Sequence, residues 1–181
     1  MPPTASHPTA EALLAAGFIL AESKGLGAMT IDDVVAEAGV AKGTFYTHFP
    51  DRGVYLATLH RQFHDGLAAL VRTAIESREP GAERLWFGAE AYLDGCLGKP
   101  ALKALLLEAR GEPLVSQAVA DRNRRFAELA AIEFRAMSWP DPLAAARLFV
   151  GMAAEAALAE LEIGRQDPPT RAALRRFIGV P

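Results

Sequence analysis

The segment TIDDVVAEAGVAKGTFYTHFPDRGVYL, residues 30–56, decides the fold of this chain. Thr30 is a typical residue to begin a helix, and Asp33 follows at the spacing of a capping box, although Glu or Gln is usual there. Apolar residues at positions 31, 34 and 35 form the buried stripe of a short helix, which Gly39 ends. A second, very short helix is predicted from about 41 to 47, and Pro50 closes the unit.

The second short helix has one apolar and one polar side. Phe45 and Phe49, together with Val40, are expected to anchor it in a core. Its outer side offers hydrogen-bonding groups, a positive charge and a glycine that lets the backbone approach a ligand closely. These outer residues are Lys42, Gly43, Thr44, Tyr46, Thr47 and His48. Two short helices joined by a tight Gly-containing turn predict a helix-turn-helix, and Arg52 adds a charge at the start of the next helix, where a phosphate is readily bound.

The segment resembles the DNA-binding signature of TetR-family regulators. The shared features, over about residues 13–56, are a Thr that caps helix two, an Ala-Gly-Val turn, Lys-Gly-Thr-aromatic-Tyr, a His and Phe-Pro. The resemblance implies a nine- or ten-helix protein whose first three helices bind DNA, while the rest bind a ligand and dimerise. It also implies that the third helix enters the major groove and that position 52 binds a phosphate. The DNA-binding set predicted in this way is Thr30, Ala41, Lys42, Gly43, Thr44, Tyr46, Thr47, His48 and Arg52.

The sequence departs from the family pattern in its charge. Many relatives have a Ser that caps helix three at the position of Ala41, and basic residues often precede helix one, whereas the first ten residues here contain none. Residues 1–60 hold three basic and six acidic side chains, a net charge of −3, and the whole chain is also at −3 with a pI near 5.8. Non-specific attraction to DNA should therefore be weak.

The composition and the positions of Gly and Pro predict an all-α chain in two parts. Hydrophobic residues make up 51% of the 181 residues, and Gly and Pro divide the chain into about nine helical segments. We expect a helix-turn-helix domain over 1–50 and a ligand-binding and dimerisation domain over 51–181. The chain has one cysteine, an N-terminus unlike a signal peptide, and a charge-free apolar run of only ten residues (12–21). We therefore predict a cytoplasmic protein that binds neither a membrane nor a cofactor.

The second part contains aromatic and aliphatic segments that suit a largely apolar small-molecule pocket. The pocket candidates are Phe63, Trp86, Tyr92, Cys96, Arg110, Phe126 and Met152, and Asn123 is a further polar candidate. Core packing is the competing explanation for each of them.

The stretch LAAARLFVGMAAEAALAEL, residues 143–161, is apolar around most of a helix, so it should be buried on two sides. We expect it to form a homodimer with the last helix. The predicted interface residues are Phe149, Gly151, Ala154, Leu158, Leu161, Leu174 and Phe177. A buried helix in a monomer is the alternative.

Two other functions remain open from the sequence. His60 and His64, at i and i+4 and next to Asp65, could begin a metal site of an enzyme, although no third ligand, phosphate loop or nucleophile motif is present. The acidic first sixty residues also allow a sensor of the same fold with weakened DNA binding. The favoured prediction is a dimeric, ligand-responsive repressor of a near-palindromic operator, not an enzyme.

Overall fold

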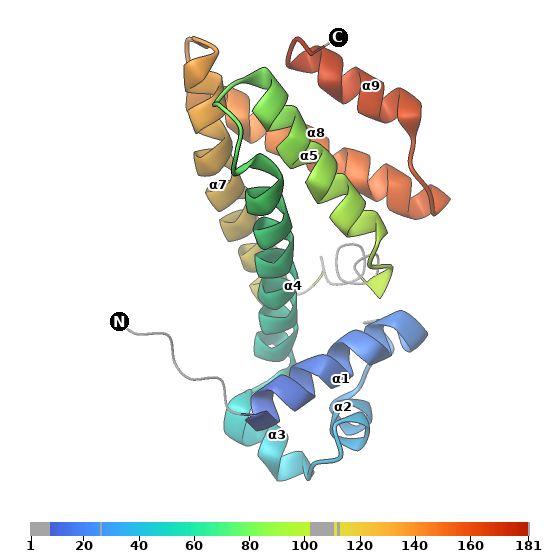
Figure 1. Cartoon of the computed structure of the whole chain (residues 1–181). Coiled ribbons are helices and arrows are strands. Elements are labelled where there is room, and N and C mark those ends of the chain that lie inside the picture. Colours follow the sequence, from blue (N-terminus) through green and yellow to red (C-terminus); the bar gives the residue numbers. More distant parts are fainter. Residues whose placement is uncertain (1–7, 26, 102–110, 112, 181) are drawn as a thin grey trace. The chain divides into compact units, whose positions relative to one another are not determined.

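The computed structural model describes residues 8–25, 27–101, 111 and 113–180, and these residues form helices and no strand. The helices are α1 (Pro8–Lys24), α2 (Ile31–Glu37), α3 (Lys42–His48), α4 (Arg52–Ile75), α5 (Ala82–Leu97), α7 (Pro113–Ala136), α8 (Pro142–Ile163) and α9 (Pro168–Phe177) (Figure 1). The all-α prediction is confirmed.

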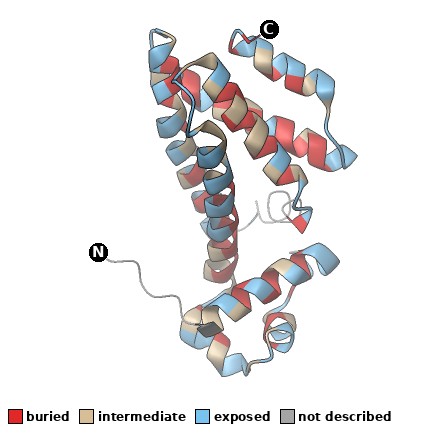
Figure 2. Ribbon diagram, viewed as in Figure 1, coloured by how far each residue is buried: buried red, intermediate tan, exposed pale blue. Residues whose placement is uncertain are grey.

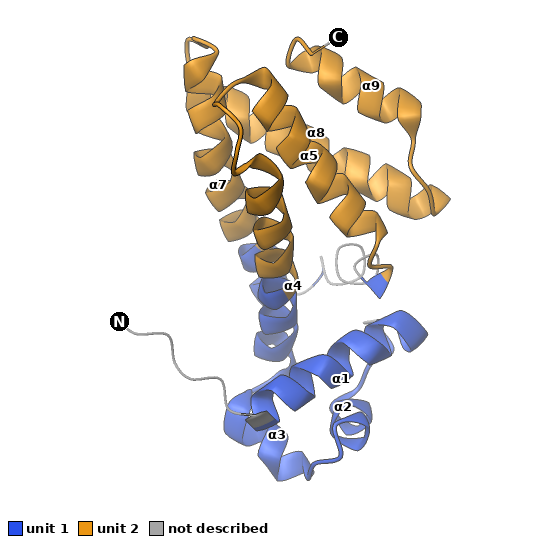
Figure 3. Cartoon of the chain, in the orientation of Figure 1, with its two compact units in different colours: residues 1–62, 101–118 blue, residues 63–100, 119–181 orange. Residues whose placement is uncertain are grey.

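The chain divides into two compact units (Figure 3). Unit 1 comprises residues 1–62 and 101–118, and unit 2 comprises 63–100 and 119–181. The division therefore falls inside α4 and again inside α7, whereas the sequence suggested a boundary at residue 50. Pro50 ends the helix-turn-helix locally, but the first turns of α4 pack on that unit and belong to it.

Unit 1 is built around a small core of aromatic and aliphatic side chains. α1 packs against α2 and α3. Phe45 is fully buried, and its ring centroid lies 5.5 Å from that of Phe49 and 5.2 Å from that of Tyr55 on α4. The Tyr55 hydroxyl donates a buried 2.7 Å hydrogen bond to the Leu13 carbonyl on α1. The start of α4 is thus fixed to both α1 and α3.

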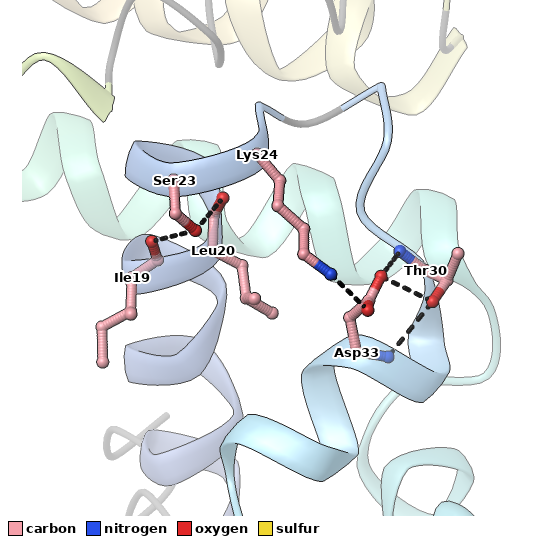
Figure 4. A network of polar contacts seen from close by, with 6 residues as sticks. All are labelled: Ile19, Leu20, Ser23, Lys24, Thr30 and Asp33. Atoms are coloured by element: carbon pink, nitrogen blue, oxygen red, sulfur yellow. Dashed lines mark hydrogen bonds and ion pairs between the residues drawn. The ribbon is translucent and has the colours of Figure 1, made fainter.

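The start of α2 shows the predicted capping box (Figure 4). Thr30 Oγ1 accepts from the Asp33 amide at 3.1 Å, and Asp33 Oδ2 accepts from the Thr30 amide at 3.0 Å. Lys24 Nζ, at the end of α1, donates to Asp33 Oδ1 at 2.7 Å. This hydrogen bond, with those from Thr30, holds the pKa of Asp33 well below its usual range.

Other helix boundaries also follow from local signals. Asp51 lies just before α4, and its Oδ1 accepts from the Val54 amide at 2.8 Å and so caps the helix. Ala41 makes no side-chain cap for α3. Gly39 has a φ of +66°, so the turn between α2 and α3 uses the left-handed conformation that glycine adopts without strain.

Unit 2 has α8 at its centre, packed against α5 and α9. Figure 2 shows buried residues along much of α8 and α5. α8 is also long and apolar enough to cross a membrane by length and composition alone, a test that the core helix of a soluble protein passes as well. The part of α4 in unit 2 buries Phe63 and Leu67, but Leu70 is 49% exposed.

A buried ion-pair network joins α9 to α8 and α5. Arg171 donates to Glu160 through Nε at 2.6 Å and through Nη2 at 2.8 Å. Arg171 Nη2 also lies 2.7 Å from Asp94 Oδ1, and the Asp167 amide donates to Glu160 Oε1 at 2.9 Å. Burial alone would raise the pKa of Glu160, but the hydrogen bonds from Arg171 and Asp167 outweigh it and lower that pKa.

Candidate DNA-binding face and ligand cavity

Helix α3 presents a polar side to solvent and an apolar side to the core of unit 1. Phe45 and Phe49 are 0% and 5% exposed, and Val40 is half-buried. Tyr46 is 49% exposed, although its ring also meets the edge of Phe45 at 5.5 Å. Seven of the predicted DNA-binding residues, all on or next to α3, are at least partly exposed to solvent. They are Ala41, Lys42, Gly43, Tyr46 and Thr47, which are exposed, and Thr44 and His48, which are half-buried.

The positive charge on α3 is engaged by a residue of α2. Lys42 Nζ lies 2.7 Å from Asp32 Oδ1, and both side chains are exposed to solvent. The hydrogen bond with Asp32 raises the pKa of Lys42. The spacing of Asp32 in the sequence does not show that α2 and α3 cross so as to bring it to Lys42.

Arg52 is held against the chain that leads into α2. Its Nε donates to the Met29 carbonyl at 3.2 Å, and the side chain is half-buried. This bond fixes the direction of the guanidinium group at the N-terminus of α4. Thr30, whose side chain takes part in the capping box, is exposed. The contacts of these residues with DNA stay predictions.

Unit 2 contains a partly open cavity of about 650 Å³ between four helices. Its lining comes from α4, α5, α7 and α8 and is mostly apolar, with aromatic side chains from three of these helices. Those aromatic residues are Tyr92, Phe126 and Phe149. The rings of Tyr92 and Phe126 meet edge to face with centroids 6.0 Å apart. A cavity of this size and character is typical of small-molecule sites.

The predicted pocket residues lie in three places. Tyr92 and Phe126 line the cavity, and Arg110 lies outside the described residues. The remaining four residues, Phe63, Trp86, Cys96 and Met152, are not among the residues that line it. Trp86 is buried with the guanidinium of Arg175 5.2 Å from its ring centroid, on the α9 side. Cys96 is fully buried, and this burial raises the pKa of its thiol to about 12, so it is packed as a core side chain.

Buried charged groups line the cavity and were not among the predicted pocket residues. Arg122, 5% exposed, donates to Asn123 Oδ1 from Nε at 3.0 Å and from Nη2 at 2.7 Å. Its Nη1 lies 3.0 Å from His64 Nε2. Glu133, 4% exposed, accepts from the Gly81 amide at 2.9 Å and lies 3.3 Å from Arg84 Nε. Arg122 could not be singled out from the sequence, because it is one of several arginines along a polar stretch.

The pair His60 and His64 does not form part of a recognisable metal centre. Within the described ranges, no group of three His, Cys, Asp or Glu side chains is placed to hold a metal ion. Both imidazoles are buried, and His64 instead meets the guanidinium of Arg122.

The predicted dimer residues on α8 and α9 differ in their exposure. Phe149, Leu158, Leu161 and Leu174 are buried within unit 2, and Ala154 is half-buried at the cavity, which Phe149 also lines. Gly151 and Phe177 are exposed. Other exposed apolar side chains on α8 are Leu143, Leu148 and Ile163, of which Leu148 is 72% exposed. Of the predicted interface residues, Gly151 and Phe177 are thus the two that are exposed, and their part in a dimer stays a prediction.

The chain is similar to known regulators in sequence over its N-terminal region and in fold over nearly its whole length. Residues 13–54 match the model of the bacterial regulatory proteins of the tetR family. No curated protein matches the chain. Among solved structures, the multidrug binding protein EbrR, complexed with imidazole, is 22% identical and covers 97% of this chain and 98% of its own, with a TM-score of 0.79.

Two further solved structures share the fold. The fatty acid degradation regulator FadR from Bacillus halodurans is 15% identical, covers 97% of each chain and has a TM-score of 0.80. A TetR-like transcriptional regulator from Rhodococcus sp. RHA1 is 17% identical, covers 94% of this chain and 93% of its own, and has a TM-score of 0.71. Residues 13–54 are thus similar to the tetR family of bacterial regulatory proteins, and the chain as a whole shares the fold of these solved structures.

Proposed function

We propose that this protein is a transcriptional regulator of the tetR family, and more specifically a cytoplasmic homodimeric repressor that binds a near-palindromic operator and is released when a small molecule enters the cavity of unit 2. The observation that carries the proposal is the exposed polar side of α3, supported from beneath by the buried Phe45 and Phe49. This is the arrangement in which a recognition helix can enter the major groove.

A dimer would place two such helices on one duplex. Exposed apolar side chains on α8 and α9, with Leu148 and Phe177 the most exposed, offer a surface that a second copy can cover. A two-fold axis would then require half-sites about 34–36 Å apart, or a multiple of that distance, in an operator with matching symmetry.

Release by a ligand is supported by the division of α4 between the two compact units. α4 contributes residues 52–62 to unit 1 and residues 63–75 to unit 2, and the latter include part of the cavity lining. A ligand that favours one position of α4 in unit 2 would thereby favour one arrangement of the two recognition helices. Such a ligand shifts the equilibrium only by its difference in affinity for the two forms, commonly about 1–3 kcal/mol.

The proposal is tested first by recovering the operator. Genomic fragments bound by the purified full-length protein at low salt should be enriched in one palindrome. Tyr46→Ala and Lys42→Ala should weaken binding to that palindrome, and Lys42→Ala should also reduce the slope of log affinity against log salt by about 1 if Lys42 contacts a phosphate. Glu22→Ala, an exposed change on α1, is the control.

The ion pair between Lys42 and Asp32 allows a more specific test of whether Lys42 faces the DNA. Asp32→Asn removes a negative charge and frees Lys42, so we expect tighter operator binding and a steeper salt dependence. Glu37→Gln removes the same charge from the same helix and should change affinity less. Equal effects of the two variants would mean that Lys42 does not face the DNA.

A sensor of the same fold with weakened DNA binding is the second candidate. The observation that favours it is the pairing of Lys42 with Asp32 in a region whose net charge is negative. Failure to enrich any palindrome, with the protein dimeric and folded, would support this candidate over the repressor.

A further inference from the structure

We infer that two copies of this chain pair through an antiparallel crossing of their α8 helices, with the two-fold axis beside Gly151 and with Arg147 of each copy opposite Glu155 of the partner subunit. This inference deepens the homodimer of the proposed function, on which it rests. It names the place where the two copies meet and the side chains that select a second copy over another partner.

One face of α8 is open to solvent and carries opposite charges on either side of a glycine. Arg147, Gly151 and Glu155 are exposed and follow one another at intervals of four residues, so they lie on the same side of the helix. Among the residues that the structure describes, neither Arg147 nor Glu155 has an ion-pair partner. At about 12 Å along the helix, they are too far apart to pair with each other. Each charge is therefore available to a group on another molecule.

A two-fold axis makes this pattern of charges self-complementary. In a symmetric interface, residue i of one copy contacts residue j of the other, and j contacts i. When two helices cross antiparallel, residues equally far before and after the axis face each other. Arg147 is four positions before Gly151 and Glu155 is four positions after it, so both contacts join opposite charges. A parallel pairing of the same faces would place like charges together, which is unfavourable.

The apolar residues of this face fit the same axis. A Cβ added at Gly151 would meet no atom within 4 Å, so a second helix can approach the backbone closely there. Leu148 is 72% exposed and lies three positions before the axis. It faces Ala154 of the partner subunit, a small, half-buried residue three positions after the axis. A large side chain thus meets a small one on each side of the axis, as interlocking helix packing requires.

The test exchanges charges in the full-length protein and measures its molar mass by light scattering and sedimentation at low salt. Arg147→Glu and Glu155→Arg each place like charges at both contacts. Each variant alone should therefore have a dimer dissociation constant raised by about 100-fold or more. An equal mixture of the two variants should restore a dimer with one copy of each, because both contacts then join opposite charges. The double variant should also be dimeric.

A matched control reverses a charge elsewhere on the helix. Glu162→Arg changes an exposed glutamate of α8, eleven positions after Gly151, and should leave the protein dimeric. Single variants that stay dimeric, or that stay monomeric when they are mixed, would overturn the inference. Circular dichroism checks the folding of each variant, which the exposed positions of both substitutions favour.

A cysteine scan locates the axis without altering any charge pair. The two copies of a residue n positions from the axis lie about 3n Å apart along antiparallel helices, because each residue rises 1.5 Å. Gly151→Cys should therefore form a disulfide between subunits on mild oxidation. Glu162→Cys, about 33 Å from its copy, should not. Cys96 is fully buried, so the wild type measures the background. A disulfide at position 162, or none at 151, would contradict the inferred axis.

Operator binding, measured separately, distinguishes this inference from the proposed function. A wild-type dimer that binds its operator, but whose variants give neither the charge exchange nor the disulfide, refutes this axis and leaves the repressor standing. A monomeric wild type refutes both the homodimer and the axis. A dimer paired as inferred that enriches no palindrome supports the axis and counts against the repressor.

Discussion

Replacing Arg171 by Met should cost the protein about 3 kcal/mol of stability. Arg171 is 8% exposed and makes two hydrogen bonds to Glu160, which is 1% exposed. Removing one partner of a buried ion pair typically costs about 3–5 kcal/mol, because the other charge stays buried. The Asp167 amide still donates to Glu160, which places the cost near the lower limit.

Urea unfolding followed by circular dichroism at pH 7 measures this loss. In a chain of this length it corresponds to a fall of about 6–12 °C in the melting temperature. Asp94→Asn is the matched control, because the Asp94 side chain is half exposed and its pair with Arg171 should contribute less than about 1 kcal/mol. Replacing both Glu160 and Arg171 by Met should recover much of the loss, since no charge then remains buried.

The loss should also depend on pH in one direction. In the wild type the pKa of Glu160 is lowered, so its contribution to stability is complete above the unfolded value of about 4.3 and falls as the pH drops through the folded value. In the variant, burial without Arg171 should raise that pKa above the unfolded value. The difference between wild type and variant should then shrink from pH 7 toward about pH 4. A loss below about 1 kcal/mol, or one that is constant over this range, would refute the reasoning.

Four further substitutions test the packing of unit 1, a position on α4 and the proposed dimer. Gly17→Ala should destabilise unit 1 by at least about 1 kcal/mol in a thermal melt, because its Cβ would lie 2.1 Å from the Tyr55 hydroxyl oxygen. Gly66→Ala, a helix position with no atom within 4 Å of the added Cβ, should stabilise the protein by up to about 1 kcal/mol, and the same sign for both variants would contradict the packing. Thr30→Ala should cost about 1 kcal/mol in urea unfolding by removing the N-cap of α2, and no change would show that the cap contributes nothing. Leu148→Glu should lower the molar mass measured by light scattering to that of a monomer, and a dimer that persists would place the interface elsewhere.

The fold of the helix-turn-helix in unit 1 was predictable because its signals are local. Thr30 and Asp33 are three residues apart, and the aromatic side chains that anchor α3 are four apart, so neighbours along the chain specify these helices and their turn. Asp51 before α4 is a signal of the same kind. The matched region, residues 13–54, lies within this part of the chain.

The composition of the second part determined that its helices have buried sides. Only the tertiary structure decided which other side chains, or which cavity, each buried side faces. Phe149 reads like an interface residue in an apolar helix, yet it faces a cavity, while Leu148 beside it is exposed. Arg122 meets His64 from 58 positions away, and Asp32 reaches Lys42 across a helix pair. Apolar periodicity gives each helix a buried side. Which distant side chains meet depends on how the helices cross, and the spacing of residues within one segment does not determine that crossing.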